Sequence, residues 1–262
     1  PQNLSAVGKI TNLRMSATMG GPAKVNFLPG TQTVHASFDY NNPSGTLTGI
    51  LTVKDDLATI FQNSRSYTGF GTQTFTIRGT DIFTAYLHEA YSNGVAMTGY
   101  ITQAQACANT VCVTQTVQMA IIEGNRMQAR LLRAQNFNNT PASLTAIGSA
   151  TAAVTSTLSE GQTIMGLTSL PAMQTHLGYM LGYANSAVTY AQQAIASADG
   201  TIANAFPNTP PCGWRYTTSV SADTGDGPSV AASVEWTVGT PGVPAQISLA
   251  ARPSNIPPGS TS

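Results

Sequence analysis

Charged side chains are scarce in this chain. Asp, Glu, Lys and Arg make up 8% of its 262 residues, whereas they make up about 25% of a typical soluble domain. Eleven basic side chains balance eleven acidic ones, and like charges do not gather in any block. Binding to nucleic acid or to anionic lipid requires a basic patch. We therefore expect no nucleic-acid partner.

The scarcity of charge is greatest in the middle of the chain. Glu160 is the only formally charged residue in the 65 residues from Ala134 to Ala198. Soluble helices normally solvate their outer face with charged side chains, but this stretch offers Ser, Thr, Gln, Asn and Gly. Either other subunits cover such a surface, or the protein works in an unusual medium such as an acidic habitat. The sequence leaves both explanations open.

Composition also indicates where the protein resides. The uncharged stretch is broken throughout by polar residues and glycine, so it predicts no membrane span, which needs about 20 mostly apolar residues. Lysine occurs only three times while Thr, Ser, Asn and Gln are abundant, a composition typical of exported prokaryotic surface proteins. The chain starts at Pro1, as a processed chain does. We expect an extracellular or cell-surface protein that does not span a membrane.

The spacing of apolar residues changes twice along the chain. Residues 9–80 alternate with period two, with turn sequences at 41–45 and 69–71, which predicts five short strands. Residues 81–198 repeat at intervals of three and four, the pattern of helices packed nearly parallel. Period two then returns, and it predicts strands at 215–221, 229–238 and 245–251.

The helical stretch predicts a bundle inserted into a β domain. Breaks at 107–111, 136–141 and 169–171 divide it into four helices, and short connections make neighbouring helices antiparallel. An even number of helices brings the chain back to where the insertion begins. We therefore predict the α+β class: an Ig-like antiparallel β-sandwich with an inserted antiparallel four-helix bundle. The predicted domains are a discontinuous sandwich (1–80 and 206–252), the inserted bundle (81–205) and a Pro/Ser-rich tail (253–262).

Three cysteines and two glycosylation sequences suit an exported protein. Cys107 and Cys112 flank the first helical turn, so we expect a disulfide between them. Cys212 would lie at the opposite end of the bundle, so it is either free or paired with another chain. Asn3 and Asn138 fit the pattern of N-glycosylation acceptors, which also arises by chance.

The sequence offers no constellation that carries catalysis. The three histidines have no second metal ligand at helical spacing, and neither a nucleophile elbow nor a phosphate-binding glycine loop is present. Asp223 and Asp226 occupy a predicted turn, where Asp caps its own backbone; a calcium ion held there is the alternative. We assign no catalytic, metal or cofactor residue and predict that the protein is not an enzyme.

A stripe of aromatic residues marks the last predicted helix. His176, Tyr183 and Tyr190 are spaced by seven, with Tyr179 beside them, and they lie off the apolar seam of that helix. Tyrosine is enriched in interface cores, where charge is depleted. We predict a subunit contact here; packing on the sandwich or on a neighbouring helix is the alternative.

Short segments resemble strands of secreted bacterial sandwich modules. Residues 233–239 resemble the closing strand of such modules, and residues 10–13 and 27–34 resemble their opening strands. Residues 247–260 look like the start of an immunoglobulin-like repeat of the invasin and intimin type, which builds extracellular stalks. By their alternation, Ile247, Leu249 and Ala251 lie on one side of the predicted strand 245–251. The resemblance implies that this is an orphan first strand, which either lies on its own sandwich or completes a neighbour's.

These observations together predict a structural subunit of an extracellular assembly, such as a filament, a pilus-like fibre or a surface layer. The expected partners are copies of the chain itself, through the charge-poor helices and β-strand edges, and other surface proteins or glycans are further candidates. The alternative is a surface adhesin or ligand-binding module on a cell-surface stalk. In that case the tyrosine stripe is exposed and the protein is monomeric.

Overall fold

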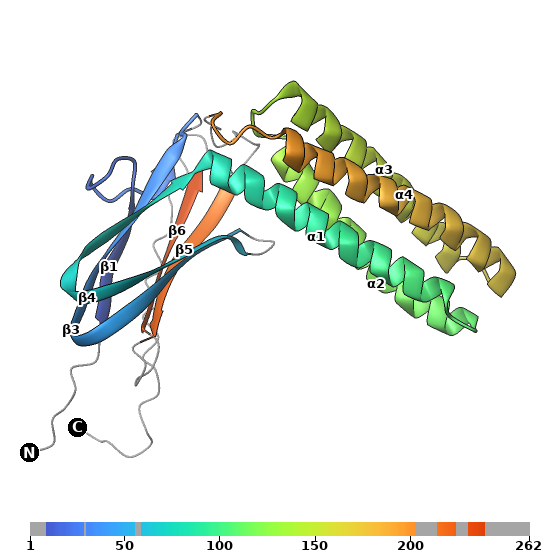
Figure 1. Cartoon of the computed structure of the whole chain (residues 1–262), viewed down its shortest axis with the longest axis horizontal. Helices are drawn as coiled ribbons and strands as arrows, with labels where there is room; N and C mark the ends of the chain where they lie inside the picture. The colour runs from blue at the N-terminus through green and yellow to red at the C-terminus, as the bar shows by residue number, and fades with distance from the viewer. Residues whose placement is uncertain (1–8, 29, 56–58, 203–213, 224–229, 239–262) are drawn as a thin grey trace, which may run out of the picture. The chain divides into compact units, whose positions relative to one another are not determined.

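The computed structural model describes residues 9–28, 30–55, 59–202, 214–223 and 230–238 (Figure 1). The chain forms two compact units, one from Pro1–Gly79 with Ala205–Ser262 and the other from Thr80–Asn204. The first unit is built on strands and the second on helices, so the predicted α+β class is confirmed. Several predicted features lie outside the described residues: Asn3, Cys212, Asp226, Ile247, Leu249 and the strand at 245–251.

Six strands of the described residues form the sheet of the first unit. Their order is β1-β3-β5-β6-β2, and β4 pairs with β3. All pairs are antiparallel except the short parallel contact between β2 and β6. The bounds are β1 Lys9–Ser16, β2 Asn26–Phe27, β3 Thr33–Lys54, β4 Thr59–Arg78, β5 Trp214–Asp223 and β6 Val230–Val238.

Two turns predicted from the sequence are wrong. Residues 41–45 and 69–71 belong to β3 and β4, which are continuous strands of 22 and 20 residues. The Pro-Ser-Gly sequence lies within β3, at a shift in the pairing register with β4 between Asn42 and Thr46. Such an irregularity accommodates proline and glycine, which do not fit well in a regularly hydrogen-bonded strand pair. Gly69, which pairs with Asn42, has a φ of 72°, a conformation that glycine adopts without strain.

The long strands also change the predicted architecture. One edge of β3 pairs first with β1, through Asn41, and then with β5, from Thr48 onward. The two sheets of the expected sandwich therefore stay joined through β3. The sheet curls, and β1 comes close to β6. The described strands thus form one curled sheet rather than a closed sandwich (Figure 1).

The core of this unit is centred on Trp236. Its ring stacks on Tyr216, with the centroids 4.5 Å apart, and meets the edge of Phe27 at 5.6 Å. The indole Nε1 donates a 2.8 Å hydrogen bond to the hydroxyl of Thr218, and both residues are fully buried. Val34, Ala36 and Phe38 of β3 are also fully buried.

A bulge in β1 places a polar cluster on Asp39 of β3. Asn12 has a φ of 54°, within the register shift between Thr11 and Arg14. Its side-chain amide donates to one carboxylate oxygen of Asp39 at 2.7 Å, and Thr72 of β4 donates to the other at 2.7 Å. The Arg14 guanidinium lies 3.9 Å away. Asp39 therefore links three neighbouring strands.

We expect this cluster to make the stability of the sheet depend on pH. The hydrogen bonds from Asn12 and Thr72, and then the charge of Arg14, lower the pKa of Asp39. A carboxylate of this kind stabilises the fold above its unfolded pKa of about 4, and the stabilisation is lost as the pH falls through its lower folded value. Asp39→Asn should lower the melting temperature at pH 7 and reduce its fall between pH 4 and pH 2, as measured by thermal denaturation. The same measurements on Glu235→Gln, an exposed carboxylate of β6, serve as the control and should show neither change.

The second unit contains four helices, as the sequence predicted. Pro141 and Pro171 occupy the first turns of α3 and α4, where the missing amide hydrogen does no harm. Asn109 and Thr140 cap α2 and α3 by accepting hydrogen bonds from backbone amides. The bounds are α1 Gly79–Gln105, α2 Thr110–Ala134, α3 Pro141–Met165 and α4 Leu170–Ser197.

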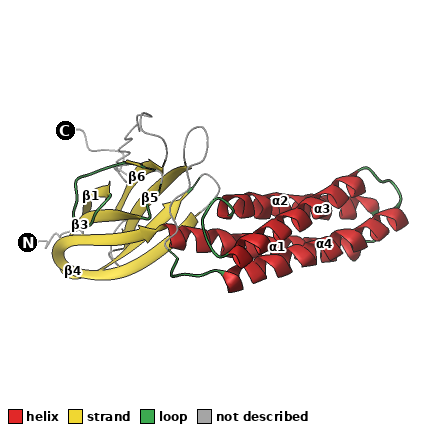
Figure 2. Cartoon of the chain, turned by 90° about the horizontal axis from the view of Figure 1, so that it is seen from above, coloured by secondary structure: helices red, strands yellow, loops and turns green. Residues whose placement is uncertain are grey.

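Figure 2 shows the helices of this bundle. Three glycines indicate which helices are in contact. A Cβ at Gly94 of α1 would lie 2.9 Å from Met127 of α2 and 3.0 Å from Val188 of α4. A Cβ at Gly124 of α2 would meet side chains of α1 and α3, and one at Gly161 of α3 would meet side chains of α2 and α4. Each helix therefore packs against its two neighbours in chain order, around a closed ring.

These contacts predict a strong preference for glycine at position 161. A Cβ there would lie 2.9 Å from Ile121 and 3.1 Å from Met180, so we expect Gly161→Leu to destabilise the bundle by about 1–3 kcal/mol through overpacking. Gly178 of α4 has no atom within 4 Å of its Cβ position, and Gly178→Leu should stabilise the helix by about 0.5–1 kcal/mol. Thermal denaturation followed at 222 nm compares the two. Equal melting temperatures would contradict this packing.

The two ends of the helical unit are tied together. The hydroxyl of Thr80 donates to the carbonyl of Ile202 at 2.8 Å. Nearby, the Asn139 side chain accepts from the amide of Asp199 at 3.1 Å and donates to its carbonyl at 3.3 Å. The chain therefore leaves this unit at the place where it enters.

Candidate interaction surface

The charge-poor helices α3 and α4 pack against each other. Most of their buried residues are small, which lets two helix axes approach closely. The buried residues of α3 are Ser143, Ala146, Ile147, Ala150, Val154, Thr157, Gly161 and Ile164. Those of α4 are Met173, Leu177, Met180, Ala184, Ala187, Ala191 and Ala194, which recur at intervals of four and three.

Hydrogen bonds between the two helices fix their register. The buried hydroxyl of Ser143 donates to the carbonyl of Ala194 at 2.9 Å, and Thr140 donates to the carbonyl of Ser197 at 2.7 Å. Both acceptors lie in the last turn of α4, where helix carbonyls have no partner within the helix. The pair is thus held rigidly at this end, and its outer surface has a defined shape.

The polar residues of this surface keep most of their hydrogen bonds within the helix. Many Ser and Thr hydroxyls of α3 and α4 donate to the carbonyl four residues earlier, at 2.9–3.3 Å. A hydroxyl bonded in this way offers no donor to water and turns its methyl group or remaining lone pair outward. The exposed or partly exposed residues of this kind are Thr151, Thr155, Ser156, Thr163, Thr175, Ser186 and Thr189, whereas Thr157 is buried. The surface is therefore less polar than its composition suggests.

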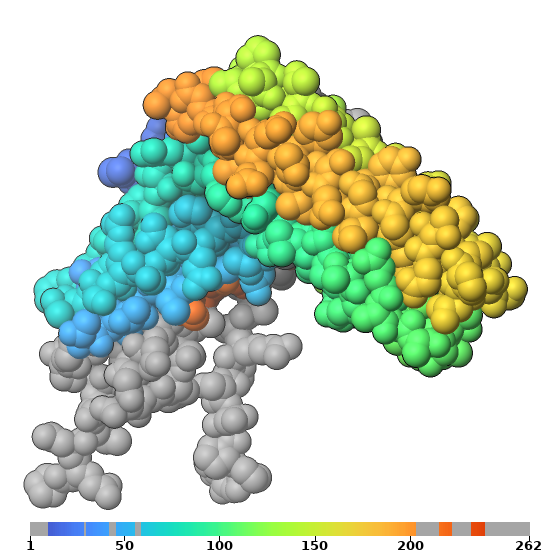
Figure 3. All heavy atoms as spheres, turned by 45° about the vertical axis from the view of Figure 1, so that its right-hand side comes forward, coloured from blue at the N-terminus to red at the C-terminus, as the bar shows by residue number. Residues whose placement is uncertain are grey.

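Three tyrosines on α4 have exposed side chains. Tyr179 is 57% exposed, Tyr183 44% and Tyr190 37%. Their spacing of four and seven residues places them in one row along the helix, beside its buried seam. Figure 3 shows α4 running along one face of the helical unit, and the exposure of the three side chains places the row on the surface of that unit.

The fourth residue predicted for this stripe has a different environment. His176 Nδ1 lies 2.8 Å from a carboxylate oxygen of Glu160, and its ring meets Tyr179 edge-on with the centroids 5.9 Å apart. Its side chain is 32% exposed and that of Glu160 is 23% exposed. Glu160, the single acidic residue of this region, thus has a partner at one end of the row. Because His176 and Glu160 are sixteen residues apart and lie on different helices, the sequence did not indicate this contact.

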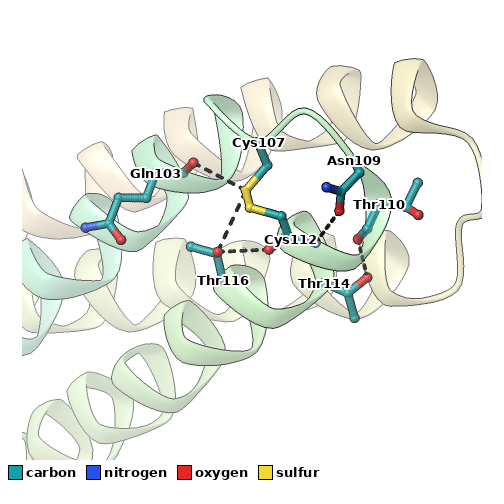
Figure 4. Close-up of a disulfide and its surroundings, with 7 residues drawn as sticks. All are labelled: Gln103, Cys107, Asn109, Thr110, Cys112, Thr114 and Thr116. Carbon is teal, nitrogen blue, oxygen red and sulfur yellow. Dashed lines mark hydrogen bonds between the residues drawn. A yellow bond between two sulfur atoms is a disulfide. The ribbon is translucent and has the colours of Figure 1, made fainter.

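The two cysteines of the bundle form the expected disulfide (Figure 4). The Cα atoms of Cys107 and Cys112 are 5.7 Å apart. The Asn109 side chain accepts a hydrogen bond from the Cys112 amide at 2.9 Å, and the Thr116 hydroxyl lies 3.9 Å from the Cys107 sulfur. The bond closes the connection between α1 and α2 at one end of the bundle.

Asn138, the glycosylation candidate within the bundle, lies on the surface between α2 and α3. The neighbouring Asn139 is buried and bonded to Asp199, and Thr140 of the same acceptor sequence is engaged as the cap of α3. Asn138 therefore has an exposed side chain next to residues that are held in place.

The histidines are distributed over both units. His35 of β3 lies 3.2 Å from the Thr76 hydroxyl, and burial lowers the pKa of its imidazole. His88 is exposed on α1. Within the described parts of the chain, no three His, Cys, Asp or Glu side chains are grouped so that they could hold a metal ion. Nor does any described helix combine the length and the apolar run that a membrane crossing needs.

Two exposed features of the sheet were not predicted. Phe70 of β4 is 84% exposed, and the Gly-Phe-Gly sequence that surrounds it was interpreted as a turn. The second feature is the long edge of β4 itself. Only the structure reveals it, because the sequence divided this strand into two.

No protein-family model, curated protein or solved structure matches this chain. Its function must therefore be inferred from its own residues.

Proposed function

We propose that this protein is a structural subunit of an extracellular assembly, a filament, fibre or surface layer. Its copies would pack through the outer face of α3 and α4 and through β-strand edges. The observation that carries the proposal is the tyrosine row on a helix pair with a single acidic side chain, Glu160, whose carboxylate is engaged by His176.

The size of this face suits a stable contact. A helix of 28 residues is about 40 Å long, and two adjacent helices are about 20 Å wide. Their outer face therefore offers about 800 Å² per partner, the area of a standard protein interface. Tyrosine is enriched among the residues that dominate binding energy. Covering back-bonded hydroxyls costs little, because their donors already have partners.

The disulfide between Cys107 and Cys112 supports an extracellular location, because such bonds persist in oxidising compartments. We also infer that the curled sheet belongs to a secreted immunoglobulin-like module. The buried Trp236 near the end of the last described strand supports this inference, together with the resemblance of residues 233–239 to closing strands of such modules.

Sedimentation and electron microscopy test assembly directly. The purified chain should form regular particles or fibres above a threshold concentration. Because the contact has few charges, assembly should be nearly unchanged between 0.05 and 1 M NaCl, whereas an interface built on ion pairs would weaken over this range. A monomer at high concentration under all these conditions would refute the proposal.

A surface adhesin is the second candidate, since exposed tyrosines also bind glycans and proteins. That function predicts a monomer that is retained on glycan or protein arrays and released by substitutions at Tyr183 and Tyr190. Array binding by a chain that does not assemble would favour the adhesin over the subunit.

A further inference from the structure

Among the described residues, β4 has one partner strand, β3, with which it pairs from Thr59 to Arg78. Its other edge is paired with no described strand. Twenty residues extend about 60 Å at the usual rise of a strand, although curling shortens the span here. Figure 2 shows β4 along the outer margin of the sheet.

This edge carries few of the devices that normally prevent pairing between molecules. Natural edge strands carry lysine, proline or inward-pointing charges, or are short. β4 has no Lys, Pro, Asp or Glu, and its sequence is dominated by Thr, Ser, Gln and aromatic residues, most of which favour strands. Arg65 and Arg78 are its only charges. The main chain of β4 is thus suited to receive another strand.

The same chain contains a segment suited to supply that strand. Residues 245–251, outside the described part, read Ala-Gln-Ile-Ser-Leu-Ala-Ala, in which Ile247 and Leu249 alternate with Gln246 and Ser248. Pro244 precedes the segment and a second proline follows it by two residues, which limits a strand to about this length. The 13 residues from 239 to 251 carry no charge.

The order of strands favours pairing between two copies. The segment follows β6, and β5 and β3 separate β6 from β4 in the sheet. Pairing within one chain requires the six-residue connection 239–244 to cross those strands, whereas pairing with a neighbour does not. We propose that residues 245–251 of one copy add a strand to the free edge of β4 in a second copy. This inference rests on the proposed assembly and names one of its contacts.

Paired aspartate variants test the donor strand. In Ile247→Asp/Leu249→Asp the two apolar side chains that would pack on the sheet are charged, while Gln246→Asp/Ser248→Asp places the same charges on the other side. We expect the first variant to raise the threshold concentration for assembly at least tenfold and the second to change it less than threefold. Each variant should melt as the native monomer does, because the segment would be paired only in the assembly.

Crosslinking identifies the acceptor. One copy carries Ser248→Cys and another carries Thr68→Cys, an exposed position on β4, and both carry Cys212→Ser. Treatment of the mixture with a bismaleimide should join the two copies. A third variant carries both cysteines in one chain. If crosslinks form only within this chain, and if the Ile247→Asp/Leu249→Asp monomer melts at a lower temperature than the native one, the strand pairs with its own sheet. That outcome would overturn the inference.

The two proposals fail in different ways. A native chain that stays monomeric contradicts the assembly itself. A native chain that assembles, and whose Ile247→Asp/Leu249→Asp variant assembles equally well, contradicts the strand exchange alone and leaves the α3–α4 face as the contact.

Discussion

Tyr183→Lys should raise the threshold concentration for assembly by at least tenfold while leaving the fold intact. Tyr183 is 44% exposed in the row of tyrosines on α4. In an assembly, the introduced ammonium group would be buried against a surface that offers few charges as partners, and removing an anchoring tyrosine from an interface costs about 2 kcal/mol or more. Analytical ultracentrifugation of the native and variant chains measures the change.

A matched substitution on another helix provides the control. Leu132 of α2 is 47% exposed and has Arg133 as its neighbour. Leu132→Lys should leave assembly unchanged, because we place no contact on that part of α2. Both variants should melt within about 2 °C of the native chain, since surface substitutions rarely change stability by more than about 0.5 kcal/mol. Equal assembly of the two variants would remove the tyrosine row from the contact.

The largest loss of stability is expected for Trp236→Ala. This change removes a fully buried ring that packs on Tyr216 and Phe27 and leaves the Thr218 hydroxyl without its indole donor. Truncations of this kind cost about 3–5 kcal/mol, which should lower the melting temperature of the sheet by about 10 °C or more. Tryptophan fluorescence reports on this unit, because Trp214 and Trp236 both lie in its strands.

Trp236→Phe separates the ring from its hydrogen bond. Phenylalanine keeps most of the aromatic contact but cannot donate to Thr218, so we expect a loss of about 1–3 kcal/mol. Since Trp214 remains as the fluorophore in both variants, the two melting curves can be compared directly. A loss for Trp236→Phe equal to that of Trp236→Ala would mean that the hydrogen bond, rather than packing, dominates this site.

The helices could be predicted because a seven-residue repeat is a global pattern. The residues of α2 that recur at intervals of three and four from Val113 to Ala134 are all buried, and so are those of α4 from Met173 to Ala194. The pattern is less accurate for α3. Leu144 and Leu158 follow the same spacing but are only partly buried, while Ala146 and Thr157 are buried. Small residues line both the inside and the outside of this helix, so hydrophobicity alone does not distinguish its faces.

The sheet was harder to predict because its deciding features are not local. Asn42 and Gly69 lie within sequences that usually form turns, and only the pairing of β3 with β4 across them shows one continuous ribbon. Asp39 lies in an evident alternating strand, but its partner Asn12 is positioned by a bulge that the sequence does not indicate. For the candidate surface, the tyrosine row followed from spacing, whereas the contact of His176 with Glu160 depends on the register of two helices.

The hydrogen bond between Thr80 and Ile202 has a practical consequence. A segment whose two ends meet can be exchanged as a unit. It can be removed and replaced by a short linker, or it can be inserted into a surface loop of an unrelated protein. Evolution can use the same property, lengthening or exchanging the helices without redesigning the strands that carry them. The sheet could then serve as a constant frame on which different spacers are mounted.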